Sequence, residues 1–166
     1  MDLILWRHAE AQEWPVSVLQ TAQTGQMGQI CQDMERRLTQ RGEKQATRMG
    51  AWLDRQLPEG ARIMVSPARR CEQTALALGR KYKVMAELTP DACPNSLLEL
   101  VQWPHAKRPI VVIGHQPTLG QTIAQLLGLQ EAECAVKKGA LWWLRHRERH
   151  DCTQTVVVTV QSPETL

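Results

Sequence analysis

The order of apolar and polar stretches along the chain predicts an α/β fold. Three apolar runs have the length of a buried strand and lie at residues 3–6, 61–65 and 109–114. Each run precedes a segment whose apolar residues recur at helical spacing, at residues 39–57, 66–82 and 118–128. Strands that alternate with helices form a mainly parallel central sheet with helices on both faces, which is a three-layer α/β sandwich.

The ends of these predicted helices carry recognisable signals. Thr39 is a suitable cap for the first helix, and Gly128 is suited to end the third. Before the second helix, Ser66 precedes Pro67. We interpret Ser66 as the helix cap rather than as a ligand, with Pro67 at the first helical position.

Near the C-terminus the pattern predicts a β-hairpin. Residues 140–144 and 155–160 are apolar, and the polar segment RHRERHDC between them is expected to form the hairpin tip. Its His146, His150 and Cys152 are interleaved with arginines, whose charge would repel a cation. We therefore expect a solvated turn there and no metal site.

One long stretch, residues 13–35, is rich in Gln, Gly and Met and lacks a clear pattern. We predict an irregular insertion there, because unpatterned segments of this length are usually functional lids or disordered. The chain has no internal repeat and no linker, and 166 residues suffice for one hydrophobic core. Residues 1–166 are therefore predicted to form a single domain.

The composition narrows the class of protein. The 43% hydrophobic and 22% charged residues are typical of a soluble globular protein, and no run approaches the ~18 apolar residues of a membrane span. The N-terminal segment lacks the basic start and the long apolar run of a signal peptide. The five cysteines are widely spaced without a CxxC pair, which indicates reduced thiols. We expect a cytoplasmic protein that does not bind membranes.

The basic residues favour a phosphate ligand over nucleic acid. The 20 basic residues comprise 14 arginines and 6 lysines, and the planar guanidinium group matches the oxygen atoms of a phosphate. The sequence has no dense basic run with interleaved aromatic residues, so we expect no nucleic-acid binding.

Histidines and arginines follow the ends of the three predicted strands. Arg7 and His8 come directly after the first strand, residues 66–70 after the second and His115 after the third. Ligands bind at the carboxyl ends of strands in an open α/β sheet, and the helix N-termini located there favour anions. His8 would be either a nucleophile that attacks phosphorus or a hydrogen-bonding group for a bound anion.

The same residues lie within a series of motifs that resemble those of the histidine phosphatase superfamily, the phosphoglycerate-mutase-like proteins. The matching segments are LILWRHAEA at 3–11, RRLTQRGEKQA at 36–46, VSPARRCEQTA at 65–75, ELTPDACPNSLLEL at 87–100, VIGHQPTLG at 112–120 and KKGALWWL at 137–144. The segments at 87–100 and 137–144 are particularly similar to the small phosphohistidine phosphatases of the SixA type. Ala9 stands where the family's Arg-His-Gly signature has Gly.

The resemblance implies a phosphoglycerate-mutase-like fold and a role for each matching residue. His8 would be the nucleophile that becomes phosphorylated. The residues that would hold the phosphoryl oxygens are Arg7, Arg36, Arg70 and His115.

The motifs also select between neighbouring arginines. Arg36 is chosen over Arg37 because the SixA-type pattern is Arg-x-Leu-Thr. Arg70 is chosen over Arg69 because the functional arginine follows Pro67 by three residues in the family pattern. We expect both neighbours to face solvent.

The sequence offers no clear general acid. The resemblance implies that larger family members protonate the leaving alkoxide with a carboxylate on an inserted helical segment, for which this chain has no room. Glu87 is the nearest candidate, and Glu10 or a residue of 13–35 are alternatives. A weak acid favours a leaving group that is easily protonated, such as the imidazole of phosphohistidine.

These observations lead to three hypotheses about function. The first is a phosphatase without metal or cofactor that forms a phospho-His8 intermediate and acts on a phosphohistidine-bearing protein. The second is the same chemistry on a small phosphate ester. The third is a non-catalytic, phosphate-binding regulatory module, which Ala9 makes conceivable but the complete set of pocket residues disfavours.

Overall fold

The computed structural model describes residues 1–13, 26–149 and 152–166, and within those ranges it contains six strands and five α-helices. The strands are β1 (Asp2–Arg7), β2 (Arg62–Val65), β3 (Lys83–Val84), β4 (Ile110–Gly114), β5 (Leu141–Arg149) and β6 (Cys152–Gln161). The α-helices are α2 (Gln26–Glu35), α3 (Gln40–Gln56), α4 (Arg69–Leu76), α5 (Pro94–Leu100) and α6 (Thr118–Leu127). Two short 3-10 helices are η1 (Ala86–Leu88) and η2 (Pro163–Thr165).

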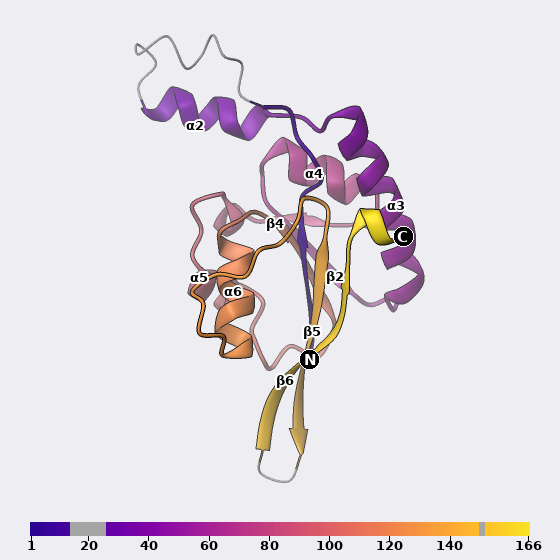
Figure 1. The fold of residues 1–166 in the computed structure, drawn as a ribbon, viewed down its shortest axis with the longest axis vertical. Helices are drawn as coiled ribbons and strands as arrows, with labels where there is room; N and C mark the ends of the chain where they lie inside the picture. The colour runs from indigo at the N-terminus through magenta and orange to yellow at the C-terminus, as the bar shows by residue number, and fades with distance from the viewer. Residues whose placement is uncertain (14–25, 150–151) are drawn as a thin grey trace.

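The strands of the described residues join in one mixed sheet with the order β3-β2-β4-β1-β5-β6 (Figure 1). The neighbours from β3 to β1 pair in parallel, whereas β5 and β6 pair antiparallel. Arg7 at the end of β1 lies beside Gly114 at the end of β4, so the next residues, His8 and His115, leave the sheet at the same edge. The predicted mainly parallel sheet is confirmed.

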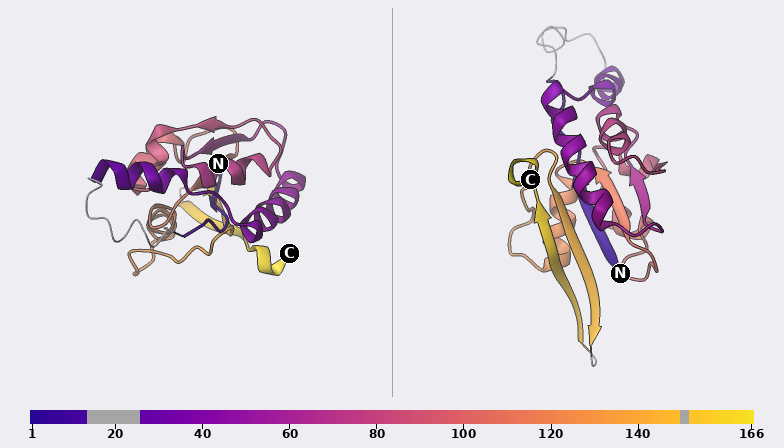
Figure 2. Two further views of the ribbon diagram at one scale, coloured as in Figure 1. Left: turned by 90° about the horizontal axis from the view of Figure 1, so that it is seen from above. Right: turned by 90° about the vertical axis from the view of Figure 1, so that its right-hand side faces the viewer.

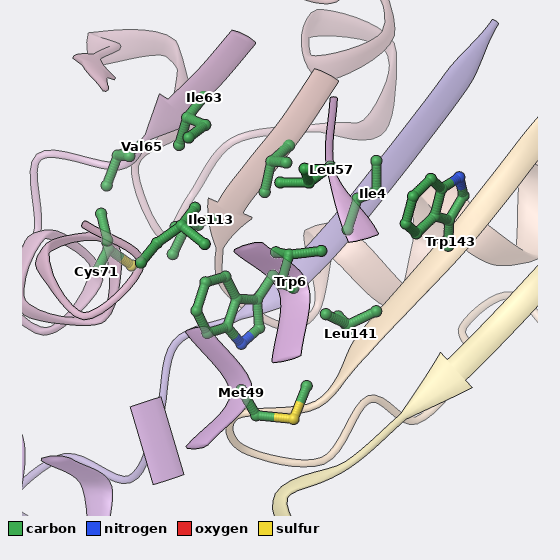
Figure 3. Close-up of a cluster of buried hydrophobic side chains, with 14 of the residues drawn as sticks. Ile4, Trp6, Met49, Leu57, Ile63, Val65, Cys71, Ile113, Leu141 and Trp143 are labelled. Carbon is green, nitrogen blue, oxygen red and sulfur yellow. The ribbon is translucent and has the colours of Figure 1, made fainter. Parts of the chain in front are cut away.

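Helices cover both faces of this sheet. Side chains alternate along β1, so Ile4 and Trp6 pack toward α3 and α4 while Leu3 and Leu5 pack toward α5 and α6. Figure 3 shows the first of these clusters, in which Trp6 lies above Met49 of α3. Full burial of one large apolar side chain contributes roughly 1.5–3 kcal/mol. The two clusters, one on each face of the sheet, confirm the predicted three-layer sandwich.

The capping signals of two helices are confirmed, and those of the second are wrong. Thr39 Oγ1 accepts a hydrogen bond from the Gly42 amide at 3.0 Å, and Gly128 ends α6 with φ of 63°. However, α4 begins only at Arg69 and has no side-chain cap. The Ser66 hydroxyl instead contacts His115, which follows β4, and accepts a hydrogen bond from the Ala68 amide before the helix begins. After the helix the chain turns at Gly79, with φ of 73°.

The C-terminal hairpin is longer than the apolar runs indicate and projects from the body of the molecule (Figures 1 and 2). The polar residues expected in its turn continue β5 through Arg149, and His146 pairs with Thr155 of β6. Polar side chains are tolerated there because the projecting strands are exposed to solvent. His150 lies outside the described residues.

The predicted irregular segment at 13–35 is wrong for its second half. Residues 26–35 form α2, and residues 14–25 lie outside the described part of the chain. Met34 of α2 packs against the cluster beneath α3 and α4, which explains how this polar helix is held. Among the described helices, none is long and apolar enough to cross a membrane.

Candidate active site

A cavity of about 280 Å³ lies at the carboxyl ends of β1, β2 and β4. Its charged and titratable lining residues are Arg7, His8, Asp33, Arg36, Arg70, His115 and Lys138. Five of them are the residues singled out in the sequence as nucleophile and phosphate ligands. The other two, Asp33 and Lys138, were not assigned as nucleophile or phosphate ligand from the sequence.

His8 follows β1 directly and is 7% exposed. Its Nδ1 lies 2.8 Å from the Ala9 carbonyl oxygen. A carbonyl oxygen only accepts hydrogen bonds, so Nδ1 carries the proton and Nε2 keeps its lone pair. Burial, with contributions from the positive charges of the neighbouring residues, holds the pKa of His8 well below 6.5. His8 is therefore a neutral imidazole with a free nucleophilic nitrogen at pH 7.

The chain on either side of His8 is fixed by hydrogen bonds. The His8 amide donates to the Gly114 carbonyl at 3.1 Å, and the Ala9 amide donates to Thr74 Oγ1 at 3.1 Å. Ala9 is fully buried and packs against Leu38 and Ala46. The methyl group that replaces the family's Gly is thus accommodated by packing.

His115 follows β4, and its ring lies beside that of His8, with ring centroids 5.2 Å apart and the ring planes tilted by 57°. Arg70 Nη2 lies 3.3 Å from its Nδ1, and Ser66 Oγ lies 2.7 Å from its Nε2. Because arginine only donates, Nδ1 is the acceptor and Nε2 donates to Ser66. Burial and the charge of Arg70 lower the pKa of His115 to about 3. A ligand contact by His115 requires one of these two bonds to open.

Arg7 and Arg70 present buried donors at the cavity. Arg70 is 3% exposed, and Arg7 Nη1 donates to the Val136 carbonyl at 2.7 Å. Among the described residues, neither Nε atom has a hydrogen-bond partner. Buried donors without partners are rare in proteins and costly, whereas phosphoryl oxygens would satisfy them. The arrangement is suited to bind a phosphoryl group.

Asp33 of α2 bridges two of the arginines. Its Oδ2 accepts from Arg70 Nη2 at 3.0 Å, and its Oδ1 accepts from Arg36 Nε at 2.9 Å. Burial alone would raise the pKa of Asp33, but the charges of Arg70 and Arg36 outweigh it and lower the pKa. Asp33 is therefore ionised at neutral pH.

The neighbouring arginines lie outside the cavity. Arg69 is about half exposed and pairs with Glu35 at 3.7 Å, and Arg37 is exposed. Their positions agree with the preference for Arg36 and Arg70.

A comparison with models of protein families shows the family of this chain. Residues 3–92, more than half of the sequence, match the model of the histidine phosphatase superfamily, branch 1. The chain belongs to the histidine phosphatase superfamily. The match includes His8, Arg36 and Arg70, while His115 lies beyond it. No curated protein matches the chain in sequence.

Solved structures of similar fold include two SixA proteins. The protein histidine phosphatase SixA in complex with tungstate is 25% identical with a TM-score of 0.70, and 99% of each chain is covered. A protein assigned as the phosphohistidine phosphatase SixA of Agrobacterium tumefaciens is 22% identical with a TM-score of 0.72, and 98% of each chain is covered. A phosphoserine phosphatase variant of Entamoeba histolytica with bound phosphoserine is 16% identical with a TM-score of 0.68, covering 99% of this chain and 98% of its own. Family and pocket together support a phosphatase with a phosphoglycerate-mutase-like fold.

Two of the candidate acids of this histidine phosphatase, Glu87 and Glu10, lie away from the cavity. Glu87 is exposed on η1 and is not among the lining residues. Glu10 is also absent from the lining, because its Oε1 accepts from Thr39 Oγ1 at 2.8 Å and its Oε2 pairs with Arg41 at 3.6 Å. Within the described residues, Asp33 is the one carboxylate that lines the cavity, and it is ionised.

Two of the site residues have roles that sequence reasoning missed. Ser66 was interpreted as a cap, yet its hydroxyl contacts His115, and these two residues follow different strands, β2 and β4. Asp33, in the last turn of α2, lies three residues before Arg36, which follows the helix, and acid–base pairs at this spacing lie close together where the chain is helical. That spacing is the signal by which Asp33 could have been found.

Proposed function

We propose that this protein is a phosphohistidine phosphatase. His8 Nε2 attacks the phosphorus atom of a phosphohistidine side chain on a protein substrate, and the P–N bond of the substrate breaks as a P–Nε2 bond forms. The substrate imidazole leaves and takes up a proton. Water then attacks the phosphorus atom, the P–Nε2 bond breaks, and inorganic phosphate and neutral His8 are restored.

The neutral state of buried His8 carries this proposal. Its Nδ1–H bond to the Ala9 carbonyl directs the lone pair of Nε2 away from the main chain, and burial keeps the ring unprotonated. A protonated histidine would have no lone pair with which to attack phosphorus. The arginines beside it supply fixed positive charge for the oxygens of the transferring group.

The acid–base groups of the cavity favour phosphohistidine as the substrate. Among the described lining residues the one carboxyl group is ionised, so no carboxylic acid is available as a proton donor near neutral pH. An alkoxide leaving group requires a proton donor in the transition state, whereas imidazole is readily protonated near pH 7. The similarity to SixA structures supports the same choice.

The test compares substrate classes under identical conditions. A histidine-phosphorylated protein domain competes with a panel of phosphate esters that includes phosphoserine, and phosphate release from each is measured. We expect kcat/KM for the phosphohistidine domain to exceed that for each ester by about a hundredfold or more, or about 3 kcal/mol in transition-state stabilisation. A preference for any of the esters would contradict the proposal and identify a small-molecule phosphatase.

Two variants control the comparison. His8→Ala removes the proposed nucleophile and is expected to abolish turnover. His105→Ala removes an exposed histidine that does not line the site and is expected to retain it.

A further inference from the structure

Asp33 holds two arginines of the cavity in fixed positions. Arg70 donates through Nη1 to the Asp33 carbonyl oxygen at 2.6 Å and through Nη2 to Oδ2 at 3.0 Å. Arg36 donates through Nε to Oδ1 at 2.9 Å, and its Nη2 lies 2.8 Å from the same oxygen. One residue therefore contacts both guanidinium groups along their edges.

The helix that carries Asp33 is itself anchored. Met34 packs against the core cluster beneath α3 and α4, and Arg36 Nη1 donates to the Gln12 carbonyl at 3.0 Å. Packing of Met34 therefore holds the helix that carries Asp33, and the contact of Arg36 with Gln12 holds the chain that follows the helix. This arrangement gives the Asp33 carboxylate a fixed position from which it contacts the two guanidinium groups.

The contacts of Asp33 do not use every hydrogen-bond donor of Arg70. They occupy the Nη atoms of Arg70, while its Nε remains buried without a partner among the described residues. The cavity of about 280 Å³ is open while these contacts are in place. The cavity therefore has room for a phosphoryl group beside the carboxylate.

We infer that Asp33 is a positioning residue of this site, which holds Arg70 and Arg36 in orientations in which their remaining donors meet the phosphoryl oxygens. The inference rests on the proposed function only in that the cavity binds a phosphoryl group. Misplacing a catalytic group by about 1 Å can cost about a hundredfold in rate. The gain from preorganised arginines thus offsets the repulsion between the Asp33 carboxylate and a bound anion.

Charge and geometry predict opposite effects for this carboxylate. By charge alone, removing Asp33 would make the cavity more positive and tighten anion binding. By position, removing it would loosen two of the arginines and weaken anion binding. The sign of the change therefore distinguishes a positioning carboxylate from one that competes with the substrate.

The experiment measures binding and turnover separately. Binding of inorganic phosphate is followed by calorimetry, and hydrolysis of an aryl phosphate gives kcat and KM. For Asp33→Asn we expect phosphate binding about tenfold weaker and kcat lower by about ten- to a hundredfold. Unchanged or tighter phosphate binding would overturn the inference.

A matched control comes from the same helix. Glu35→Gln removes an equal charge from α2, but Glu35 contacts exposed Arg69 and not the cavity. We expect its phosphate affinity and kcat to stay within about twofold of the wild type, as for most surface substitutions. An equal loss in Glu35→Gln would show that the charge of α2, and not the position of Asp33, matters.

A second variant separates geometry from charge. Asp33→Glu keeps the charge and displaces the carboxylate by one methylene, so weaker phosphate binding supports positioning and wild-type binding contradicts it. This variant decides the question even if Asp33→Asn does not fold. Failure of the wild type to dephosphorylate phosphohistidine would overturn the proposed function alone, because phosphate binding reports on Asp33 without turnover.

Discussion

Replacing His115 by Gln removes a group that the fold keeps neutral, and this change alters how stability depends on pH. Burial and Arg70 lower the pKa of His115 from 6.5 to about 3. Below pH 6.5 the unfolded chain takes up a proton at this position, whereas the folded chain does so only near pH 3. Acidification therefore favours unfolding, and stability is lost as the pH falls through this window. Between pH 7 and pH 5 the loss from His115 alone is about 2 kcal/mol.

Urea unfolding at pH 7 and pH 5, followed by circular dichroism in phosphate-free buffer, measures this loss. The wild type is expected to lose about 2 kcal/mol more than His115→Gln over this range. Each protein is compared with itself, so any constant destabilisation by the substitution cancels. His105→Gln, at an exposed histidine, is expected to keep the wild-type dependence. Equal pH dependence of wild type and His115→Gln would refute the account of a neutral, buried His115.

Two further substitutions test how the fold holds the site. Ser66→Ala removes the acceptor of the His115 Nε2 proton, so we expect the free energy of unfolding to fall by about 1–3 kcal/mol and kcat to fall as well. Urea unfolding and steady-state kinetics measure the two quantities. Unchanged values of both would contradict the assigned tautomer of His115. Gly42→Ala would place a methyl group against the Glu10 carbonyl oxygen and is expected to lower the melting temperature by several degrees in calorimetry. Gly60→Ala, whose added Cβ would meet nothing closer than 3.8 Å, is the control, and equal melting temperatures for the two variants would contradict the close approach.

The sheet could be predicted from the sequence because its signals are local. The apolar run at 109–114 is bounded by polar residues and becomes β4 with a shift of one residue at its start. Every residue of this strand is buried, as expected for an apolar run in the centre of a parallel sheet. The strand ends then follow, and with them the places of His8 and His115.

The remaining features depend on contacts between distant parts of the chain. Ser66 resembles a cap in its local context, but His115 competes for its hydroxyl across 49 residues. The apolar residues of α2 show only a weak helical pattern in the sequence. The helix also contacts the site over long range, as when Asp33 binds Arg70 across 37 residues. Glu87 was the nearest candidate for the general acid by its position in the sequence, yet it lies exposed on η1 and outside the cavity. Sequence spacing cannot report such contacts.

The central claim is that His8 accepts the phosphoryl group, and trapping the phosphoenzyme tests it most directly. The wild type is mixed with a phosphorylated substrate and quenched within milliseconds in alkali, where a P–N bond persists, and the modified peptide is mapped by mass spectrometry. We expect one phosphoryl group on His8, retained in His105→Ala and absent with loss of turnover in His8→Ala. A phosphoryl group on His115, or wild-type turnover by His8→Ala, would contradict the account.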